Sequence, residues 1–404
     1  MIAYTLAFLF CLPVALYLSW QIGNYLTWKD YHRKPTEPST APATSLALAI
    51  PYRNEAANLP TLLQSLAALN LADLQVTALF INDHSEDNGP TLLANMLGEA
   101  AGAGEGSGSS VSGTQRLPNG LQVELLNLAD EIGQLDVVAM KKAALTFGIQ
   151  RAEADVIVTI DADCTLPADL LQNISRAFHK RTQAVMGPVL NAPVEDVLTG
   201  FQALDLAAYQ FLTAVSVYKT QPTLANGACF AFRKQAFIDV DGYAGMRHLP
   251  SGDDVLLLHK FVNHYPDTAF NWVSSSTAVL TQPVRSWKAL WHQRLRWAGK
   301  AGEYQSSGLE FAQAVTFAAC FSLLALIPLS LHLRSVALLI VPWLAKIIID
   351  FLSLRATLKQ YGRGSDMRYY WPAIFIYPPF LLAVGTAALL GFSSDWKGRP
   401  PRQD

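Results

Sequence analysis

Charged residues are scarce in this sequence. Of its 404 residues, 51% are apolar and only 15% are charged, and the formal net charge is −2. A nucleic-acid-binding protein normally carries a basic face, so this near-neutral balance argues against nucleic acid as a partner. The length and the apolar share instead predict one large α/β domain together with membrane segments.

Cysteine is also rare. There are four cysteines, Cys11, Cys164, Cys229 and Cys320, and their spacing is not that of metal ligands. Two of them fall in apolar stretches typical of membrane segments. We therefore interpret all four as free thiols of a reducing compartment.

The amino terminus has no basic residue ahead of its first apolar run. Residues 2–22 are almost continuously apolar, which matches the about 20 residues that a bilayer span requires. A cleaved signal peptide would have a basic start, a shorter apolar core and a small-residue cleavage site. Here Trp20, Tyr25 and Trp28 follow instead, as in an interfacial aromatic belt. Residues 1–28 are therefore predicted to form a transmembrane helix.

The first basic cluster follows this helix. Lys29, Arg33 and Lys34 lie in a predicted linker, residues 29–44, whose proline-bounded part at 35–42 is expected to be extended. By the positive-inside rule, the amino terminus lies outside and the next domain lies in the cytoplasm. The sequence thus predicts an integral protein of the cytoplasmic (inner) membrane with a cytoplasmic catalytic domain.

Residues 45–285 alternate short apolar runs with longer helical stretches, which is typical of a mainly parallel sheet covered by helices. The predicted strands are residues 46–50, 76–81, 122–127 and 156–160. Residues 98–113, rich in Gly, Ser and Ala, are predicted to form a flexible surface loop without chemistry. Ligands of open α/β sheets bind outside the carboxyl ends of the strands, so the polar residues after these strands should share one edge.

An Asp-X-Asp pair, Asp161 and Asp163, stands at the end of the last of these strands. Two carboxylates one residue apart suit a divalent metal ion, Mg²⁺ or Mn²⁺, that holds a diphosphate. A solvated turn is the alternative for so short a motif. Three further motifs favour the functional interpretation: Ile81-Asn-Asp-His-Ser85, Gly252-Asp-Asp254 and Gln293-Arg-Leu-Arg-Trp297.

Six segments, in their order and spacing, resemble the family 2 glycosyltransferases with a GT-A fold, and among them the membrane-integrated members. They are Ile50-Pro-Tyr-Arg-Asn-Glu55, Asn82-Asp-His-Ser85, Lys141-Lys-Ala-Ala-Leu145, Asp161-Ala-Asp-Cys164, Gly252-Asp-Asp254 and Gln293-Arg-Leu-Arg-Trp297. The resemblance covers roughly residues 45–300 and implies a nucleotide-sugar-binding α/β domain between an N-terminal helix and a C-terminal helical group. Two positions depart from the family pattern: Asn82 stands where an acidic residue is common, and Met140 where a small residue or Asn is usual.

The resemblance also implies residue roles. Asp163 and Asp161 are the implied metal ligands. The implied donor-binding residues are Pro51, Arg53, Glu55, Asp83, Lys141, Asp161 and Arg296, and the implied acceptor-binding residues are Asn226, Gly227, Gln293 and Trp297. For Asp83 the alternative is a helix cap, a role that Ser85 fills equally well. For Lys141 the alternative is a solvated lysine at the start of a helix.

Inverting transfer needs a base that takes a proton from the acceptor hydroxyl. The resemblance favours Asp254 as this base, with Asp253 in support. Repulsion between neighbouring carboxylates is expected to raise the pKa of one of them. Caps for a helix predicted over 255–262 are the alternative role, and the residues alone leave both open.

Residues 286–308 are predicted to form an amphipathic helix at the membrane surface that carries the motif Gln293-Arg-Leu-Arg-Trp297. The guanidinium of Arg296 can bind phosphate oxygens through two parallel hydrogen bonds. Trp297 offers a flat face to a sugar ring, and Gln293 offers a directed hydrogen bond. Interfacial anchoring by Arg and Trp is the simpler interpretation and explains part of the pattern.

The rest of the chain is strongly apolar. Residues 309–392 are predicted to form a C-terminal transmembrane region with segments at 311–331, 336–352 and 372–390, followed by a basic tail at 393–404. Three spans would place the C-terminus outside, yet Lys397, Arg399 and Arg402 favour the cytoplasm. One segment is therefore expected to be re-entrant or interfacial.

The sequence thus predicts a membrane-integrated, metal-dependent, inverting glycosyltransferase. Its donor is a UDP- or GDP-linked sugar, and its acceptor is a membrane lipid or lipid-linked molecule. The small C-terminal region favours a single transfer over the first alternative, a processive polysaccharide synthase. The second alternative is a catalytically silent membrane scaffold, against which the retained Asp161, Asp163, Asp254 and Arg296 argue.

Overall fold

The computed structural model describes residues 2–32, 42–100, 114–132, 140–246, 249, 251–273 and 275–392. The chain divides into two compact units. The helical unit comprises residues 1–35, 191–224 and 283–401, and the sheet unit comprises residues 36–190, 225–282 and 402–404. Most of the predicted linker, residues 101–113 of the predicted surface loop and the tail at 393–404 lie outside the described residues.

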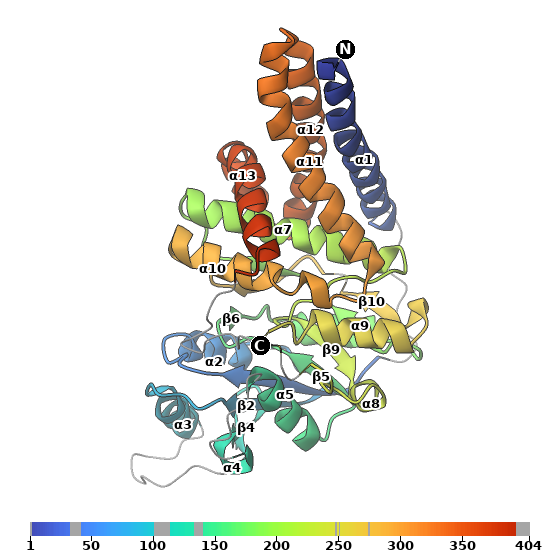
Figure 1. Ribbon diagram of the computed structural model, residues 1–404. Coiled ribbons are helices and arrows are strands. Elements are labelled where there is room, and N and C mark those ends of the chain that lie inside the picture. The colour runs from blue at the N-terminus through green and yellow to red at the C-terminus, as the bar shows by residue number, and fades with distance from the viewer. Residues whose placement is uncertain are drawn as a thin grey trace. The chain divides into compact units, whose positions relative to one another are not determined.

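The sheet unit is built on an eight-stranded, mostly parallel sheet with the order β10-β7-β9-β5-β1-β2-β4-β3 (Figure 1). β1 lies between β2 and β5 and is parallel to both, and β2 is parallel to β4. β9 is antiparallel to β5 and β7. The strands are β1 Ser45–Tyr52, β2 Gln75–Asn82, β3 Gln115–Arg116, β4 Gln122–Asn127, β5 Val156–Thr159, β7 Ala184–Met186, β9 Phe230–Arg233 and β10 Phe270–Trp272. A second sheet has the order β6-β11-β8, with bounds Cys164–Thr165, Val279–Thr281 and Val189–Asn191.

The four strands predicted from the sequence are confirmed. β4 has the predicted bounds, and the others differ from prediction by one or two residues at an end. Seven of the eight residues of β1 are buried, as expected for a central parallel strand covered on both faces. Such strands read as continuous apolar runs, which is why the sequence reveals them.

Helices cover this sheet. They are α2 Leu59–Ala67, α3 Gly89–Ala100, α4 Ala129–Ile132, α5 Met140–Arg151, α6 Leu170–Ala177, α8 Lys234–Asp239 and α9 Val255–His264, with a short 3₁₀ helix at Asp267–Ala269. The first residues of the predicted surface loop, 98–100, belong to α3, so that loop begins later than predicted. α5 packs closely on β2 at Gly148, where an added Cβ would lie 2.4 Å from Cδ1 of Ile81.

Four helices of the described chain are long and apolar enough to cross a membrane, and all belong to the helical unit. They are α1 Ile2–Tyr31, α11 Ser307–His332, α12 Val336–Gln360 and the stretch Gly364–Leu389, which contains α13 Tyr370–Leu389. The unit also contains α7 Val197–Tyr218 and α10 Trp287–Ala298. Large apolar side chains such as Phe8, Leu12, Val341 and Phe375 are exposed on these candidate spans, as expected for surfaces that face lipid.

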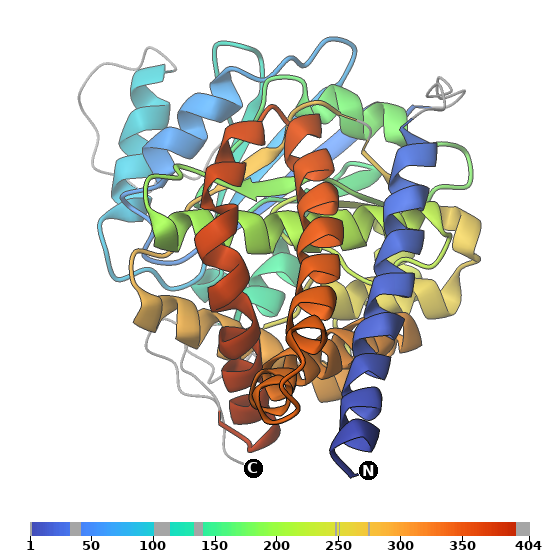
Figure 2. The same cartoon turned by 90° about the horizontal axis from the view of Figure 1, so that it is seen from above.

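α1 packs against α11 and α12 (Figures 1 and 2). An apolar cluster that includes Tyr17 and Ala319 lies at this contact. The buried face of α1 also carries polar groups: the hydroxyl of Tyr17 donates to Asp350 of α12 at 2.7 Å, and Asn24 accepts from Lys219 at 2.6 Å. These bonds satisfy polar groups inside the helical unit, so α1 is joined to its neighbours by specific contacts as well as by apolar packing.

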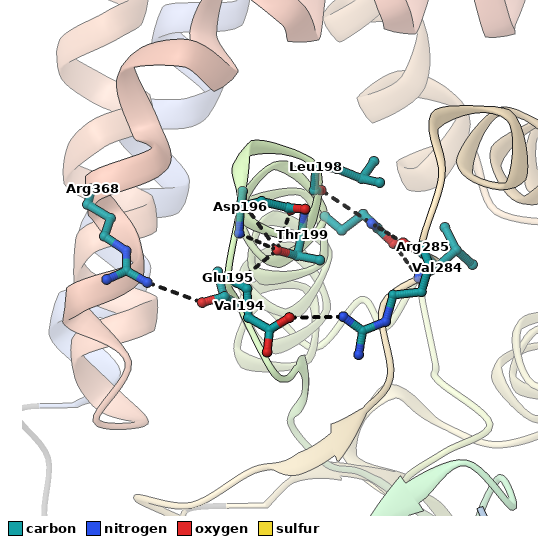
Figure 3. Close-up of polar contacts among 9 residues, drawn as sticks. Val194, Glu195, Asp196, Leu198, Thr199, Val284, Arg285 and Arg368 are labelled. Carbon is teal, nitrogen blue, oxygen red and sulfur yellow. Dashed lines mark hydrogen bonds and ion pairs between the residues drawn. The ribbon is translucent and has the colours of Figure 1, made fainter. Parts of the chain in front are cut away.

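The amino terminus of α7 is capped within the helical unit (Figure 3). The side chain of Asp196 accepts from the backbone N–H of Thr199 at 2.8 Å, and the hydroxyl of Thr199 accepts from the N–H of Asp196, which forms a capping box. An exposed ion pair joins Arg285 and Glu195 at 3.1 Å beside it.

Two parts of the helical unit differ from the sequence analysis. The predicted interfacial helix at 286–308 is shorter, because α10 ends at Ala298 and α11 begins at Ser307. α12 runs to Gln360, eight residues past its predicted end at 352, because the Lys, Arg and Gln residues of its last turns are good helix formers although they are not apolar. α7, which lies inside the range predicted for the catalytic domain, clusters with the apolar helices.

Candidate active site

The residues that follow β5, β1 and β2 come together at one edge of the sheet in the sheet unit. These strands are parallel neighbours, so their carboxyl ends point the same way. Arg53 and Glu55 follow β1, Asp83 follows β2, and Asp161 and Asp163 follow β5. Pro51, also predicted to contact the donor, is buried within β1.

The loops after β1 and β2 are fastened to each other. The backbone N–H of Asn54 donates to Ser85 at 3.1 Å, and the side chain of Asn54 accepts from the N–H of Glu86 at 2.8 Å. Arg53 forms an ion pair with Glu86 at 2.8 Å. Asn54 has a φ of 53°, a left-handed conformation that Asn adopts more readily than most residues. The two loops therefore form one surface.

Asp83 lies buried beneath this surface, with Nδ1 of His84 at 3.3 Å from its carboxylate. The alternative role of Asp83, a cap of the helix that follows, depends on a contact with the first backbone N–H groups of α3. The first N–H of α3, at Gly89, donates to Asp87 at 3.1 Å, so the contact expected of Asp83 or Ser85 is made by Asp87. The buried carboxylate of Asp83 stays a predicted donor ligand.

Acidic groups gather around Asp163. The carboxylate of Asp163 accepts from the hydroxyl of Thr281 at 3.2 Å. Burial raises the pKa of Asp163 to about 6, and the negative charges of Asp161 and Glu55 add to the effect. The carboxylates of this cluster are poorly solvated and repel one another, which favours binding of a positively charged ligand.

Lys141, at the start of α5, is the cation at the centre of the site. Its ammonium lies 2.8 Å from Asp161 and 3.0 Å from Asp253, so it joins the motif after β5 to the Gly252-Asp-Asp254 motif. Burial alone would lower the pKa of Lys141, but Asp161 and Asp253 outweigh it and hold the pKa well above the usual value. The solvated-lysine alternative does not describe this half-buried side chain, which is paired with two carboxylates.

The neighbouring Lys142 holds the loop that leads into the second motif. This side chain is buried, and its ammonium donates to the carbonyls of Leu249 and Ser251 at 2.6 and 2.9 Å. Burial would raise the pKa of Asp253, but Lys141 and Lys142 hold it below the usual value. Asp253 is therefore not the carboxylate whose pKa is raised by repulsion, because the charges of two lysines outweigh that effect.

Both carboxylate oxygens of Asp254 accept backbone N–H groups. One accepts from Val255 at 2.7 Å, as a cap of α9, and the other accepts from Gly227 at 2.9 Å. A Cβ at Gly227 would lie 3.4 Å from Asp253 and 3.5 Å from the ammonium of Lys141, so the glycine lets the backbone approach the charged cluster. The side chain of Asn226 forms a turn by accepting from the N–H of Ala228 at 3.0 Å.

The structure therefore brings together Lys141, Asp161, Asp253, Asp254 and Gly227 in direct contact. Gln293, Arg296 and Trp297 lie on α10 of the helical unit, where Ser286 caps the helix by accepting from Ala289 at 3.1 Å. Burial lowers the pKa of the Arg296 guanidinium on this helix.

The sequence analysis missed several residues of these sites. Thr281 and Lys142 act through contacts between segments far apart in the chain. Lys142 stands in the quoted segment Lys141-Lys-Ala-Ala-Leu145, but that motif does not reveal which groups its ammonium contacts. Asp205 of α7 forms a buried ion pair with Arg294 at 2.7 Å. A signal for Asp205 existed, because it is the only charged residue in the 22 residues of α7.

The carboxylates of the sheet unit can be compared with what a divalent metal ion requires. The described residues contain no group of three or more His, Cys, Asp or Glu side chains able to enclose a metal. A Mg²⁺ ion that also binds substrate phosphates needs only one or two protein carboxylates. Asp163 and Asp161, with their clustered negative charge, fit that role.

Comparison with known proteins identifies the class. A family model described as glycosyl transferase family 21 matches residues 133–399. No curated protein matches the sequence significantly. Mannosyltransferase PcManGT from Pyrobaculum calidifontis, solved with GDP-Man and Mn²⁺, matches with a TM-score of 0.53 at 15% sequence identity. The match covers 96% of this chain and 98% of the PcManGT chain. At that identity the likeness shows the fold alone.

Two other solved structures have lower TM-scores. TarS 1-349 of S. aureus has a TM-score of 0.39 at 12% identity over 88% of this chain and 98% of its own. Glucosyl-3-phosphoglycerate synthase of Mycobacterium tuberculosis, with Mn²⁺, UDP-Glc and phosphoglyceric acid, has a TM-score of 0.38 at 15% identity over 63% of this chain and 78% of its own. The predicted GT-A-type glycosyltransferase is confirmed, and the family model covers more than half of the sequence. This chain belongs to glycosyl transferase family 21.

Proposed function

We propose that this glycosyltransferase is a metal-dependent, inverting enzyme that transfers one sugar from a nucleotide-sugar to a membrane lipid or lipid-linked acceptor. The observation that carries the proposal is the contact of Lys141 with both Asp161 and Asp253. This contact joins the Asp161-Ala-Asp163 motif to the Gly252-Asp-Asp254 motif, which supports one site for the donor diphosphate and the proposed base.

The donor side is assigned to the fastened loops after β1 and β2. Arg53, Glu55 and the buried Asp83 line this region and would bind the nucleotide. The mannosyltransferase with the same fold was solved with GDP-Man and Mn²⁺, which supports a UDP- or GDP-linked sugar as donor. The ammonium of Lys141 would lie against the diphosphate and offset part of its charge.

Asp163 and Asp161 would hold the divalent ion. When bound, the ion would neutralise the negative charge that develops on the diphosphate as it leaves. The partly buried carboxylate of Asp163 supports this assignment, because the ammonium of Lys141 pairs with Asp161 and Asp253 instead.

Asp254 is the proposed base. Its carboxylate is oriented by the N–H groups of Gly227 and Val255. The acceptor hydroxyl would give its proton to Asp254 as its oxygen attacks the anomeric carbon. The bond between that carbon and the diphosphate oxygen breaks in the same displacement, and its electron pair leaves with the nucleoside diphosphate. A single displacement of this kind inverts the anomeric centre.

The lipid nature of the acceptor rests on the helical unit. Four candidate spans give this chain direct access to membrane lipids. Gln293 and Trp297 would contact the acceptor, and Arg296 stays a predicted ligand of phosphate oxygens. The need for cytoplasmic nucleotide-sugar and the basic cluster that begins at Lys29 place the sheet unit on the cytoplasmic side.

The test is a screen of purified protein in detergent with radiolabelled UDP- and GDP-sugars and total membrane lipids. We expect label from one donor to enter the organic phase as a product with a single added sugar. Products of many sugars would favour the processive polysaccharide synthase. No transfer and no donor hydrolysis with any donor would favour the silent scaffold.

A further inference from the structure

Arg294, inside the Gln293-Arg-Leu-Arg-Trp297 motif of the helical unit, forms a buried ion pair with Asp205 of α7. The Nε of Arg294 lies 2.7 Å from the Asp205 carboxylate, and the two side chains are only 8% and 10% exposed. Replacing a buried ion pair by apolar residues is often neutral or stabilising. Fold stability is therefore a weak explanation for this pair.

The same guanidinium contacts two motif residues. Nη1 of Arg294 donates to Oε1 of Gln293 at 2.5 Å, and the guanidinium carbon lies 4.1 Å from the centre of the Trp297 ring. The planar guanidinium has several donors in fixed directions and can stack on an aromatic ring at the same time. One side chain thus sets the positions of both motif residues to which an acceptor role is assigned.

α7 contacts the motif a second time. Tyr209, one turn after Asp205, packs edge-on against Trp297 with ring centres 5.9 Å apart and an interplanar angle of 83°. Two residues on one face of α7 therefore support Trp297. Asp205 does so through Arg294, and Tyr209 contacts the Trp297 ring directly.

Asp205 also lines a cavity of about 120 Å³ in the helical unit. The walls come from α1, α7, α11, α12 and α13, and they are largely aromatic and aliphatic. Asp205 thus lies between this cavity and the motif.

We propose that Asp205 and Arg294 form a positioning pair that holds Gln293 and Trp297 in place for the acceptor. The inference rests on the proposed function, because it takes the acceptor role of Gln293 and Trp297 from there. Arg294 acts through its neighbours and makes no contact with the reacting atoms in this assignment.

The kinetic test compares Arg294→Gln, Asp205→Asn and the double variant with the wild type. Each change removes a charge-assisted hydrogen bond, so we expect the acceptor KM to rise about tenfold, with the donor KM within about twofold. The double variant should be no worse than either single variant, because both act on one contact. A variant that only folded less well would lose active enzyme and kcat without a change in acceptor KM.

Arg294→Lys separates charge from geometry. A lysine can keep the charge pair with Asp205, but it cannot also bind Gln293 and cover Trp297. We expect the melting temperature to stay near that of the wild type while the acceptor KM stays raised. Full recovery of acceptor KM in Arg294→Lys, or unchanged acceptor KM in Arg294→Gln, would overturn the proposal. The matched control is Arg285→Gln, which removes an ion pair whose side chains are 58% and 63% exposed and should leave KM unchanged.

A measurement without turnover completes the test. The difference between each protein and its Trp297→Phe counterpart isolates the fluorescence of Trp297. We expect Arg294→Gln, but not Arg285→Gln, to raise acrylamide quenching of this fluorescence about twofold, because the ring loses its guanidinium cover. Unchanged quenching contradicts the positioning role even if the wild type transfers no sugar. Absence of transfer by the wild type contradicts only the proposed function.

Discussion

The centre of the candidate site is a lysine that two carboxylates share. The half-buried Lys141 pairs with Asp161 and Asp253, and the buried ammonium of the adjacent Lys142 donates to two backbone carbonyls of the loop before Asp253. The two successive lysines at the start of α5 therefore differ in role. Lys141 pairs with carboxylate side chains, and Lys142 fixes the backbone of a loop. This arrangement joins residues from three distant segments into one charged cluster.

Asp163→Asn should reduce transfer by about a hundredfold or more, because the site loses a charge needed to hold the metal ion on the diphosphate. Excess EDTA should reproduce the loss in the wild type. The measurement is initial rate in saturating donor, with circular dichroism to check the fold. Asp73→Asn makes the same chemical change in an exposed turn and should leave the rate within about twofold. Full turnover of the wild type in EDTA would refute metal dependence.

Lys141→Met should weaken donor binding by about tenfold or more, because Asp161 and Asp253 lose their shared cation and the diphosphate loses a charge partner. Titration calorimetry with the nucleoside diphosphate in the presence of Mn²⁺ measures this directly. The exposed Lys180→Met is the matched control. Unchanged affinity for the diphosphate would remove Lys141 from the donor site.

At the scale of elements, close packing of α5 on β2 positions the lysines at the start of α5. An added methyl at Gly148 would meet Cδ1 of Ile81 at 2.4 Å. Gly148→Ala should therefore lower stability by about 1–3 kcal/mol and reduce the melting temperature in detergent. Ile81→Val, which removes that Cδ1 atom, should recover part of the loss in the double variant. Gly98→Ala is the control, since its Cβ would meet nothing within 4 Å; a loss as large there would show that packing on Ile81 is not the cause.

α12 carries a buried pair of opposite charges inside the helical unit. Lys346 pairs with Asp350, which also accepts from Tyr17 of α1. Lys346→Met should cost about 3–5 kcal/mol, because it leaves Asp350 buried without its cation, whereas the double change Lys346→Met with Asp350→Leu should recover most of the stability. Thermal melting in detergent measures both. A double variant that is less stable than the single one would contradict this account.

The sequence predicts a strand well where burial on both faces requires a run of apolar residues. β1, β2 and β5 are largely apolar and mostly buried strands, and their bounds follow from that pattern. The grouping of α7 with the apolar helices does not follow from local pattern, because it depends on contacts with α1, α12 and α13. Asp161, Asp163, Asp254 and Lys141 stand in recognisable motifs. The roles of Thr281, Asp205 and Lys142 depend on long-range contacts and were not predicted, although Lys142 stands in the same motif as Lys141.

For the whole molecule, the proposed orientation places the sheet unit in the cytoplasm. Ser109, in the predicted surface loop, lies outside the described residues. Glu153 is the better labelling position because it is exposed and lies two residues after the end of α5. Cys164, Cys229 and Cys320 are buried, and Cys11 is the partly exposed one. In a Cys11→Ser background, Glu153→Cys should resist a membrane-impermeant thiol reagent in intact cells and react after permeabilisation. Labelling in intact cells would invert the topology.

The most direct test of the central claim is the effect of Asp254→Asn on turnover and on donor affinity. The account assigns Asp254 the acceptor proton and no contact with the donor. The kcat of the variant should therefore be about 10²–10⁴-fold lower than that of the wild type, while its affinity for the nucleotide-sugar changes by no more than about a few-fold. Single-turnover transfer to lipid and equilibrium donor binding, measured on the same preparations, give both quantities. Transfer at the wild-type rate, or a collapse of donor binding, would contradict the assignment of Asp254 as the base.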